Sequence, residues 1–242
     1  MQQSKKANLQ VISNELIGDN TYKLVFKDQL QAKAGQFINI KLEHHYLRRP
    51  FSIAKIKEYS FEIIYKVKGF GTTELAQVKK GSYLDVLLPL GNGFTLVENK
   101  KVLLIGGGIG VPPLLQLYDE LQDSNKLKLL VGLNNSKENI YSEYQPLITT
   151  LDGSAGYQGN VIDYLKNNNL DYDYIYACGP MAMLKALQNY LEVPGQISIE
   201  ERMGCGFGAC MGCSCQTKDK TTKRICVEGP VFALGELDLD EY

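Results

Sequence analysis

The stretch Cys205-Gly-Phe-Gly-Ala-Cys210-Met-Gly-Cys213, followed after twelve residues by Cys226, is the one around which this chain is organised. Its C-x4-C-x2-C spacing is that of plant-type [2Fe–2S] sites, in which four thiolates hold two irons. The intervening glycines can take positive φ angles and turn backbone N–H groups towards anionic sulfur. The pattern predicts a [2Fe–2S] cluster held by Cys205, Cys210, Cys213 and Cys226, in a small domain over residues 201–242.

Other uses of these cysteines stay open at this point. Cys215 follows Cys213 with one residue between them and is a second candidate for the third ligand. Four cysteines can also hold structural zinc, although zinc sites usually pair their ligands in two C-x2–4-C units. Disulfides are disfavoured because a chain of 242 residues builds its own core, and clustered cysteines in a reducing compartment are more typical of metal binding.

The bulk composition is that of a soluble globular protein, with 44% hydrophobic and 22% charged residues. A formal net charge of −1 gives no general attraction to nucleic acid or to an anionic membrane. Residues 1–11 contain lysines but no apolar segment typical of a signal peptide. No apolar run approaches the ~18 residues of a transmembrane helix. We therefore expect a cytoplasmic protein.

The first part of the chain predicts short strands separated by glycine-containing turns. β-branched and aromatic residues alternate with polar ones between these turns, which is typical of an antiparallel barrel or sandwich. We expect an all-β, barrel-like domain over residues 1–97. Its expected strands cover residues 7–17, 21–27, 36–42, 51–57, 61–67 and 82–88.

The segment Arg49-Pro50-Phe51-Ser52 begins one of these strands and carries three chemically useful side chains. A guanidinium is well shaped to bind a phosphate, Phe51 offers a flat face, and Ser52 offers a short hydroxyl. Taken alone, the segment is also compatible with an ordinary strand start that bears a surface arginine pair.

A second candidate follows the strand that ends near Lys66. It leads into Gly69-Phe70-Gly71-Thr72 and a helix that we expect to begin at a threonine. Free N–H groups at a helix start form a phosphate seat, although a plain Thr-capped helix has the same sequence. Together the two segments supply the phosphate donors and ring platform that a dinucleotide cofactor needs.

From residue 98 onward, strands alternate with helices, which predicts a doubly wound parallel α/β domain over residues 98–200. The expected strands cover residues 101–105, 128–131, 146–151, 174–177 and 197–199, with helices after residue 112 and over residues 161–166 and 181–191.

Two loops of this domain leave the carboxyl ends of strands, where nucleotides bind in open α/β sheets. Each is also compatible with a tight turn that binds nothing. Two such loops on one sheet edge favour a nucleotide site. The candidate residues are Gly106, Gly107, Gly108, Gly110, Pro112, Cys178, Gly179, Pro180 and Met181.

In this order, Arg49-Pro50-Phe51-Ser52, Gly69-Phe70-Gly71-Thr72 and residues 89–94, 106–113 and 178–180 resemble the ferredoxin–NADP reductase superfamily over residues 7–200. With the cysteine loop and residues 226–232 added, the whole chain resembles the family of electron-transfer subunits of NAD-dependent (B-type) dihydroorotate dehydrogenases. Phe51 stands where the superfamily commonly has Tyr, which keeps a ring but loses its hydroxyl. The gap before Cys226 is much shorter than in plant-type ferredoxins, so the cluster domain is expected to be a different, smaller fold.

The resemblance implies FAD on the barrel, with its pyrophosphate at Arg49, its isoalloxazine at Phe51 and its redox-active edge near Ser52. It also implies that NAD, as co-substrate, meets the flavin across the cleft between the two domains. The implied flavin-binding residues are Arg49, Pro50, Phe51, Ser52, Ile64, Tyr65, Lys66, Gly71 and Thr72.

The implied activity is that of an oxidoreductase subunit in pyrimidine biosynthesis. Electrons would pass from a partner FMN subunit that oxidises dihydroorotate, through the [2Fe–2S] cluster and FAD, to NAD, in a complex with two copies of each subunit. The flavin carries the two-electron to one-electron conversion, so no side chain is assigned as a general acid or base. Alternatives are a subunit of an NAD(P)H–ferredoxin oxidoreductase or sulfide dehydrogenase, and a redox-inactive, zinc-stabilised nucleotide-binding module.

NAD is favoured over NADP because Asn134-Asn135-Ser136-Lys137-Glu138 offers one cation and no arginine group for a second phosphate. The only histidines, His44 and His45, are expected in an exposed turn or at a strand end.

Overall fold

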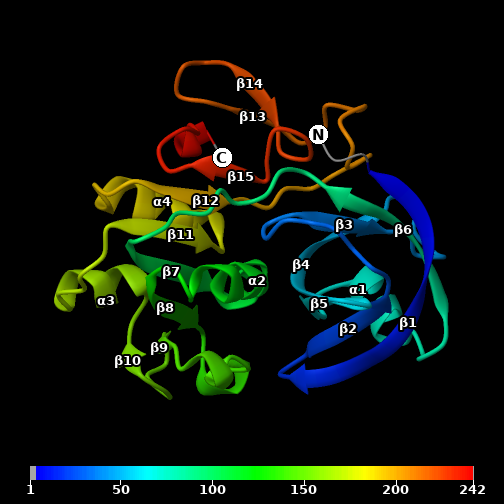
Figure 1. The fold of residues 1–242 in the computed structure, drawn as a ribbon, viewed down its shortest axis with the longest axis horizontal. Coiled ribbons are helices and arrows are strands. Elements are labelled where there is room, and N and C mark those ends of the chain that lie inside the picture. Colours follow the sequence, from blue (N-terminus) through cyan, green and yellow to red (C-terminus); the bar gives the residue numbers. More distant parts are fainter. Residues whose placement is uncertain (1–3, 242) are drawn as a thin grey trace.

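The computed structural model describes residues 4–241. Residues 1–3 and Tyr242 lie outside the described residues. Residues 1–3 belong to the expected barrel domain and to the N-terminal segment in which no signal peptide is expected. Across residues 4–241, no helix is long and apolar enough to cross a membrane. Figure 1 shows a barrel beside a layered α/β body, with the C-terminal segment lying along one end of both.

The N-terminal body is a closed antiparallel barrel with strand order β1-β2-β5-β4-β3-β6, which confirms a barrel rather than a sandwich. Alternation builds its core: Leu24 and Phe26 point inward from one strand and are fully buried, whereas Lys23 and Val25, which alternate with them, are only half-buried. The elements are β1 (Lys5–Gly18), β2 (Thr21–Lys27), β3 (Phe37–Ile40), β4 (Arg49–Lys57), β5 (Ser60–Lys66), α1 (Phe70–Ala76) and β6 (Tyr83–Leu90).

The helix α1 begins at Phe70, two residues before the expected threonine start. The reason is local, because Gly69 is its N-cap and Thr72 occupies the third helical position. The Thr72 hydroxyl accepts the backbone N–H groups of Lys68 and Gly69 at 2.9 and 3.1 Å. Those two groups are therefore engaged inside the chain rather than free for a phosphate.

The second body is a seven-stranded sheet of order β10-β9-β8-β7-β11-β12-β15, parallel except that β15 runs antiparallel to β12. Helices cover both faces, as predicted. Along β7, Leu103 and Ile105 pack towards α3 and α4, whereas Val102 and Leu104 pack towards α2. The elements are β7 (Lys101–Gly107), η1 (Gly108–Gly110), α2 (Pro112–Leu121), β8 (Lys126–Leu133), η2 (Ser136–Glu138), η3 (Ser142–Tyr144), β9 (Leu147–Thr150), β10 (Tyr157–Gln158), α3 (Val161–Asn167), β11 (Tyr174–Cys178), α4 (Met181–Tyr190) and β12 (Gly195–Ser198).

Polar contacts between α2 and β4 fix the two bodies against each other. Gln116 accepts the backbone N–H of Ile56 at 2.8 Å, and Lys55 pairs with Asp119 at 3.1 Å. These contacts place the start of α2, and the glycine loop before it, against the barrel strand that begins at Arg49.

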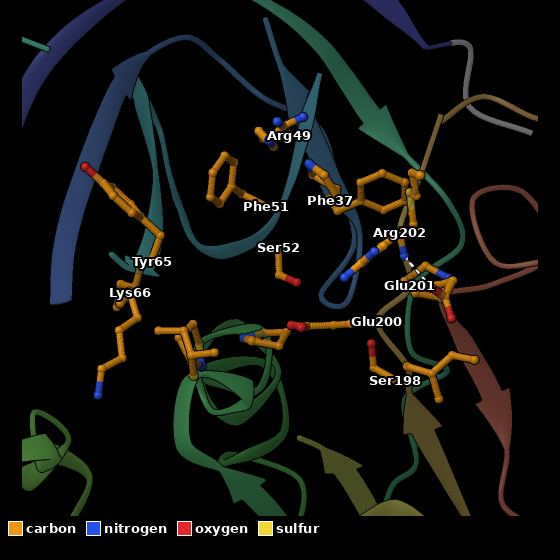
Figure 2. Close-up of a pocket in the computed structure, with 18 of the residues that line it drawn as sticks. Phe37, Arg49, Phe51, Ser52, Tyr65, Lys66, Ser198, Glu200, Glu201 and Arg202 are labelled. Carbon is orange, nitrogen blue, oxygen red and sulfur yellow. Dashed lines mark hydrogen bonds between the residues drawn. The ribbon is translucent and has the colours of Figure 1, made fainter. Parts of the chain in front are cut away.

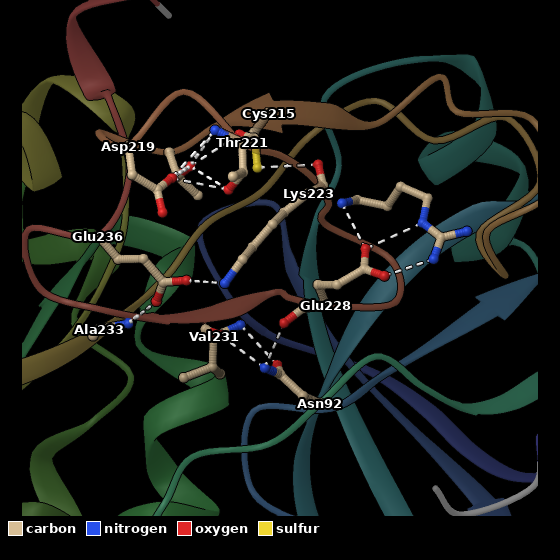
Figure 3. A network of polar contacts seen from close by, with 11 residues as sticks. Asn92, Cys215, Asp219, Thr221, Lys223, Glu228, Val231, Ala233 and Glu236 are labelled. Carbon is tan, nitrogen blue, oxygen red and sulfur yellow. Dashed lines mark hydrogen bonds and ion pairs between the residues drawn. The ribbon is translucent and has the colours of Figure 1, made fainter.

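The C-terminal segment forms a hairpin and then returns to the main sheet, through elements that the sequence did not reveal. These are β13 (Ser214–Gln216), β14 (Thr222–Arg224), β15 (Val231–Ala233) and η4 (Leu239–Glu241). The side chain of Asn92, in the turn after β6, donates to the carbonyls of Glu228 and Val231 at 2.8 Å (Figure 3). It also accepts the Val231 N–H at 3.0 Å, and because β15 pairs with β12, the segment is tied to both larger bodies.

Candidate functional site

A cleft of about 690 Å³ opens between the barrel and the carboxyl ends of the sheet strands. Figure 2 shows side chains of β4 and β5 on one side of it and residues that follow β12 on the other. The barrel wall includes the predicted Arg49, Pro50, Phe51, Ser52, Ile64, Tyr65 and Lys66, and the facing wall includes Ile109, Pro112, Ser198, Glu200 and Arg202.

The two arginines on the barrel wall of the cleft have different tasks. Arg48 donates to the carboxylate of Asp85 at 2.8 Å and to its backbone carbonyl at 2.9 Å. Burial raises the pKa of the Asp85 carboxyl, but the hydrogen bonds from Arg48 and Lys6 outweigh it and lower the pKa overall. Arg48 is therefore committed to the barrel, which leaves Arg49 as the guanidinium available to an anionic ligand.

The ring of Phe51 is supported by packing against residues of the barrel. Phe51 meets Tyr65 edge to face, with ring centroids 5.7 Å apart. The Tyr65 hydroxyl donates to Asn14 at 3.0 Å, and burial raises the Tyr65 pKa, so this phenol stays neutral. Figure 2 places Ser52 between Phe51 and the facing wall. A guanidinium, a braced ring face and a small hydroxyl along one wall fit a flavin dinucleotide.

Gly71 packs against Arg49, and neither Gly71 nor Thr72 is among the residues that line the cleft. A Cβ on Gly71 would stand 3.0 Å from Arg49 Nε, so the missing side chain lets α1 close onto the guanidinium. The Thr72 hydroxyl is used in the turn before the helix.

A second cleft of about 380 Å³ adjoins the first along the carboxyl edge of the sheet. Lys66 and Glu200 border both clefts. Lys66 pairs with Glu138 at 2.7 Å; burial raises the Glu138 pKa, but hydrogen bonds from Lys66 and Asn134 lower it overall. The predicted nucleotide residues that border this second cleft are Gly107, Gly108, Gly110, Gly179, Pro180 and Met181.

The two nucleotide loops touch through their glycines. A Cβ on Gly110 would lie 2.5 Å from the Cys178 carbonyl oxygen and 2.6 Å from the Gly179 nitrogen. Side chains at these positions would push the loops apart. Gly106 and Cys178 lie beneath the loops as buried packing residues, away from both cleft walls.

Several wall residues were not predicted, and Glu200 is the most conspicuous. It follows β12 and points into the first cleft (Figure 2). Glu200 is exposed to the cleft; partial desolvation by the protein around it raises the pKa of its carboxyl, and Lys68 partly offsets this effect. The available signal was its position just past an expected strand, at the carboxyl edge where ligands bind.

The cysteine loop lies directly downstream of this wall, because Met203 borders the cleft two residues before Cys205. Backbone N–H groups point at its sulfurs: Ala209 donates to the Cys205 thiol at 3.2 Å, and Gly212 to that of Cys210 at 3.4 Å. Burial works against ionisation of Cys205, but hydrogen bonds from this loop lower its pKa to about 6. The N–H groups of this loop therefore favour the thiolate form of Cys205.

The four thiols influence one another: Cys205 interacts with Cys210, and Cys226 interacts with Cys213 and with Cys205. Burial, followed by the neighbouring Cys213 thiol, raises the pKa of Cys226 to about 12. Among residues 4–241, no three potential metal ligands converge in a cage for a single ion. Four interacting thiols in a loop whose N–H groups point at sulfur fit a [2Fe–2S] cluster.

The thiol of Cys215 has a hydrogen-bond partner of its own. Its buried thiol donates to the carbonyl of Lys223 across the β13–β14 hairpin at 3.4 Å, within the polar network of Figure 3. Strand alternation places residues two apart on one face, so the hydrogen bond to Lys223, and not the direction of the strand, distinguishes Cys215 from Cys213.

Comparison with known proteins gives consistent matches. A family model described as the iron–sulfur cluster binding domain of dihydroorotate dehydrogenase B matches residues 200–238. The chain is 42% identical to the "Dihydroorotate dehydrogenase B (NAD(+)), electron transfer subunit" of Bacillus pumilus, over 97% of this chain and 99% of that one. It is 39% identical to the protein of the same name from Fusobacterium nucleatum, over 95% and 97% of the two chains.

Solved structures share the fold. A chain from a study of flavin-based electron bifurcation by the NADH-dependent reduced ferredoxin–NADP oxidoreductase superposes with a TM-score of 0.88. It is 29% identical and covers 97% of this chain and 91% of its own. Phthalate dioxygenase reductase, at 16% identity, superposes with a TM-score of 0.65 over 88% and 87% of the two chains and shows the fold alone.

Proposed function

The chain belongs to the family of electron-transfer subunits of NAD-dependent (B-type) dihydroorotate dehydrogenases, and we propose that it passes electrons from a partner dihydroorotate-oxidising subunit through a [2Fe–2S] cluster and FAD to NAD. The observation that carries the proposal is that one continuous segment lines the first cleft and leads to the cysteines. Residues 198–203 leave the sheet, border the first cleft and run directly into the cysteine loop. One short segment thus joins the nucleotide, flavin and cluster sites.

The bound flavin would supply exchange of two electrons with nicotinamide and of one electron at a time with the cluster. The barrel side chains would bind and orient it. Arg49 would hold the pyrophosphate, Phe51 would support the ring, and Ser52 would stand near its reactive edge, with Ile64, Tyr65 and Lys66 completing the wall and Gly71 and Thr72 setting α1 behind Arg49.

The second cleft would take NAD. Its position against Lys66 and Glu200 brings a nicotinamide from the glycine loops to the flavin wall. The carboxylate of Glu138 at this edge supports NAD over NADP, since it would repel a second phosphate. We divide the chain into a flavin domain over residues 1–97, a nucleotide domain over 98–200 and a cluster domain over 201–242.

Cys205, Cys210, Cys213 and Cys226 would hold the cluster. The interactions among these four thiols and the loop N–H groups aimed at sulfur support this set. The turn of Cys215 towards Lys223 favours Cys213 as the third ligand.

The relatives' name implies a catalytic partner, and we propose an FMN-containing one, with two copies of each subunit. Cys210 is exposed, and the apolar side chains of Phe207 and Met211 near it are 55% and 52% exposed. Exposed apolar groups beside a redox site suit a docking surface, because the partner covers them and brings its own cofactor close.

Co-expression with candidate FMN subunits tests the proposal. The purified complex should show flavin and iron–sulfur absorption and should reduce NAD when given dihydroorotate. A complex that holds FMN, FAD and cluster but gives no such turnover would favour the ferredoxin-linked or sulfide dehydrogenase alternatives. A colourless chain with stoichiometric zinc would instead indicate the redox-inactive nucleotide-binding module.

A further inference from the structure

The guanidinium of Arg49 is held from behind by groups outside the cleft wall. Its Nη1 donates to the carbonyl of Leu47 at 2.8 Å, and its Nη2 lies 3.2 Å from Nδ1 of His45. A guanidinium can only donate, so Nδ1 must accept. The neutral imidazole therefore carries its proton on Nε2. This place for His45 differs from the exposed turn expected from the sequence.

The other side of the imidazole faces α1. Nε2 of His45 lies 3.6 Å from Oε2 of Glu74, which is too long for a hydrogen bond but close enough for the carboxylate to attract the Nε2–H dipole. The second oxygen of Glu74 accepts the backbone N–H of Glu43 at 2.7 Å. The side chains of His45 and Glu74 are only 17% and 24% exposed, so water competes weakly for these contacts.

The result is a chain of contacts from helix to ligand wall: Glu74, then His45, then Arg49. Two of the five N–H donors of Arg49 are used by Leu47 and His45, which leaves three for an anionic ligand. A ligand that meets a side chain already held in place loses less affinity to the ordering of that side chain.

We propose that His45 and Glu74 are positioning residues for the flavin dinucleotide, which fix the Arg49 guanidinium in the orientation that receives the pyrophosphate. The inference rests on the proposed FAD site. Neither residue borders the cleft, so both act through Arg49 and not on the ligand.

The experiment measures the dissociation constant of FAD from the full-length chain by flavin fluorescence. His45→Ala should weaken FAD binding about tenfold, the loss expected when a hydrogen bond to a charged group is removed. His45→Asn should restore binding to within about threefold, because Asn Oδ1 stands where the histidine Nδ1 stood. Glu74→Gln should weaken binding about two- to threefold. His44→Ala, at the exposed neighbouring position, is the matched control and should bind as the wild type does.

Nitrogen NMR of His45 in the wild-type chain adds a readout that needs no flavin, and it should show the Nε2–H tautomer. The inference would be overturned if His45→Ala bound FAD as tightly as the wild type does. It would also be overturned by equal losses of affinity in His45→Ala and His45→Asn, or by an Nδ1–H tautomer. A wild-type chain that binds no FAD would refute the flavin site itself. If the wild type binds FAD and His45→Ala binds it with the same affinity, only the positioning role is refuted.

Discussion

Cys215→Ser should leave the iron–sulfur cluster in place, whereas Cys213→Ser should remove it. Cys215 is 4% exposed, and its thiol donates to the Lys223 carbonyl. A serine hydroxyl can keep that hydrogen bond, so the cost is that of placing a more polar group in a small apolar site, about 1 kcal/mol in the free energy of unfolding. The proposed role of Cys213 is different, because a hydroxyl there would take one of the four thiolates from the irons.

The assay is iron and sulfide content together with visible absorption of the purified chain. We expect about two irons per chain in the wild type and in Cys215→Ser, and a large loss in Cys213→Ser. Cys178→Ser is the matched control, since this thiol is also buried, 1% exposed, but lies in the nucleotide domain. Loss of iron from Cys215→Ser with retention in Cys213→Ser would refute the ligand assignment.

Three further outcomes follow from the geometry. In the iron-free chain, the pKa of Cys205 is lowered to about 6 and that of Cys226 is raised to about 12, so Cys205 should be alkylated half-maximally near pH 6 while Cys226 stays unmodified. Peptide mass spectrometry measures both rates, and equal rates would contradict this expectation. Glu138→Gln should cost about 1–2 kcal/mol of unfolding free energy at pH 7, because Lys66 loses its carboxylate. Since the folded-state pKa of Glu138 lies below the ordinary value of 4.5, urea titrations should show this deficit in full above about pH 4.5 and see it shrink as the pH falls through the lowered pKa. Gly110→Ala should raise the KM for NAD and leave bound flavin and iron unchanged, because its Cβ would strike the neighbouring loop; an unchanged KM would count against the nucleotide site.

Local patterns in the sequence predicted most of the fold. The alternation over residues 21–27 predicted β2 to the residue, and the apolar run beginning at Lys101 predicted β7. Such signals survive because a strand that buries one or two faces must repeat apolar residues at a fixed period. Short elements without a strong period, such as β13, β14 and β15, escaped notice, since their pairing depends on distant partners.

The sequence by itself also determined which chemistry the chain carries: a cysteine spacing, a strand that begins with arginine, and two glycine loops. The tertiary structure decided how these parts are used. It separated Arg49 from Arg48 through Asp85, turned Cys215 towards Lys223, and brought Glu200 into the cleft. Spacing along a chain fixes which side chains share a loop or a face, but only folding fixes which groups from distant strands compete for the same partner.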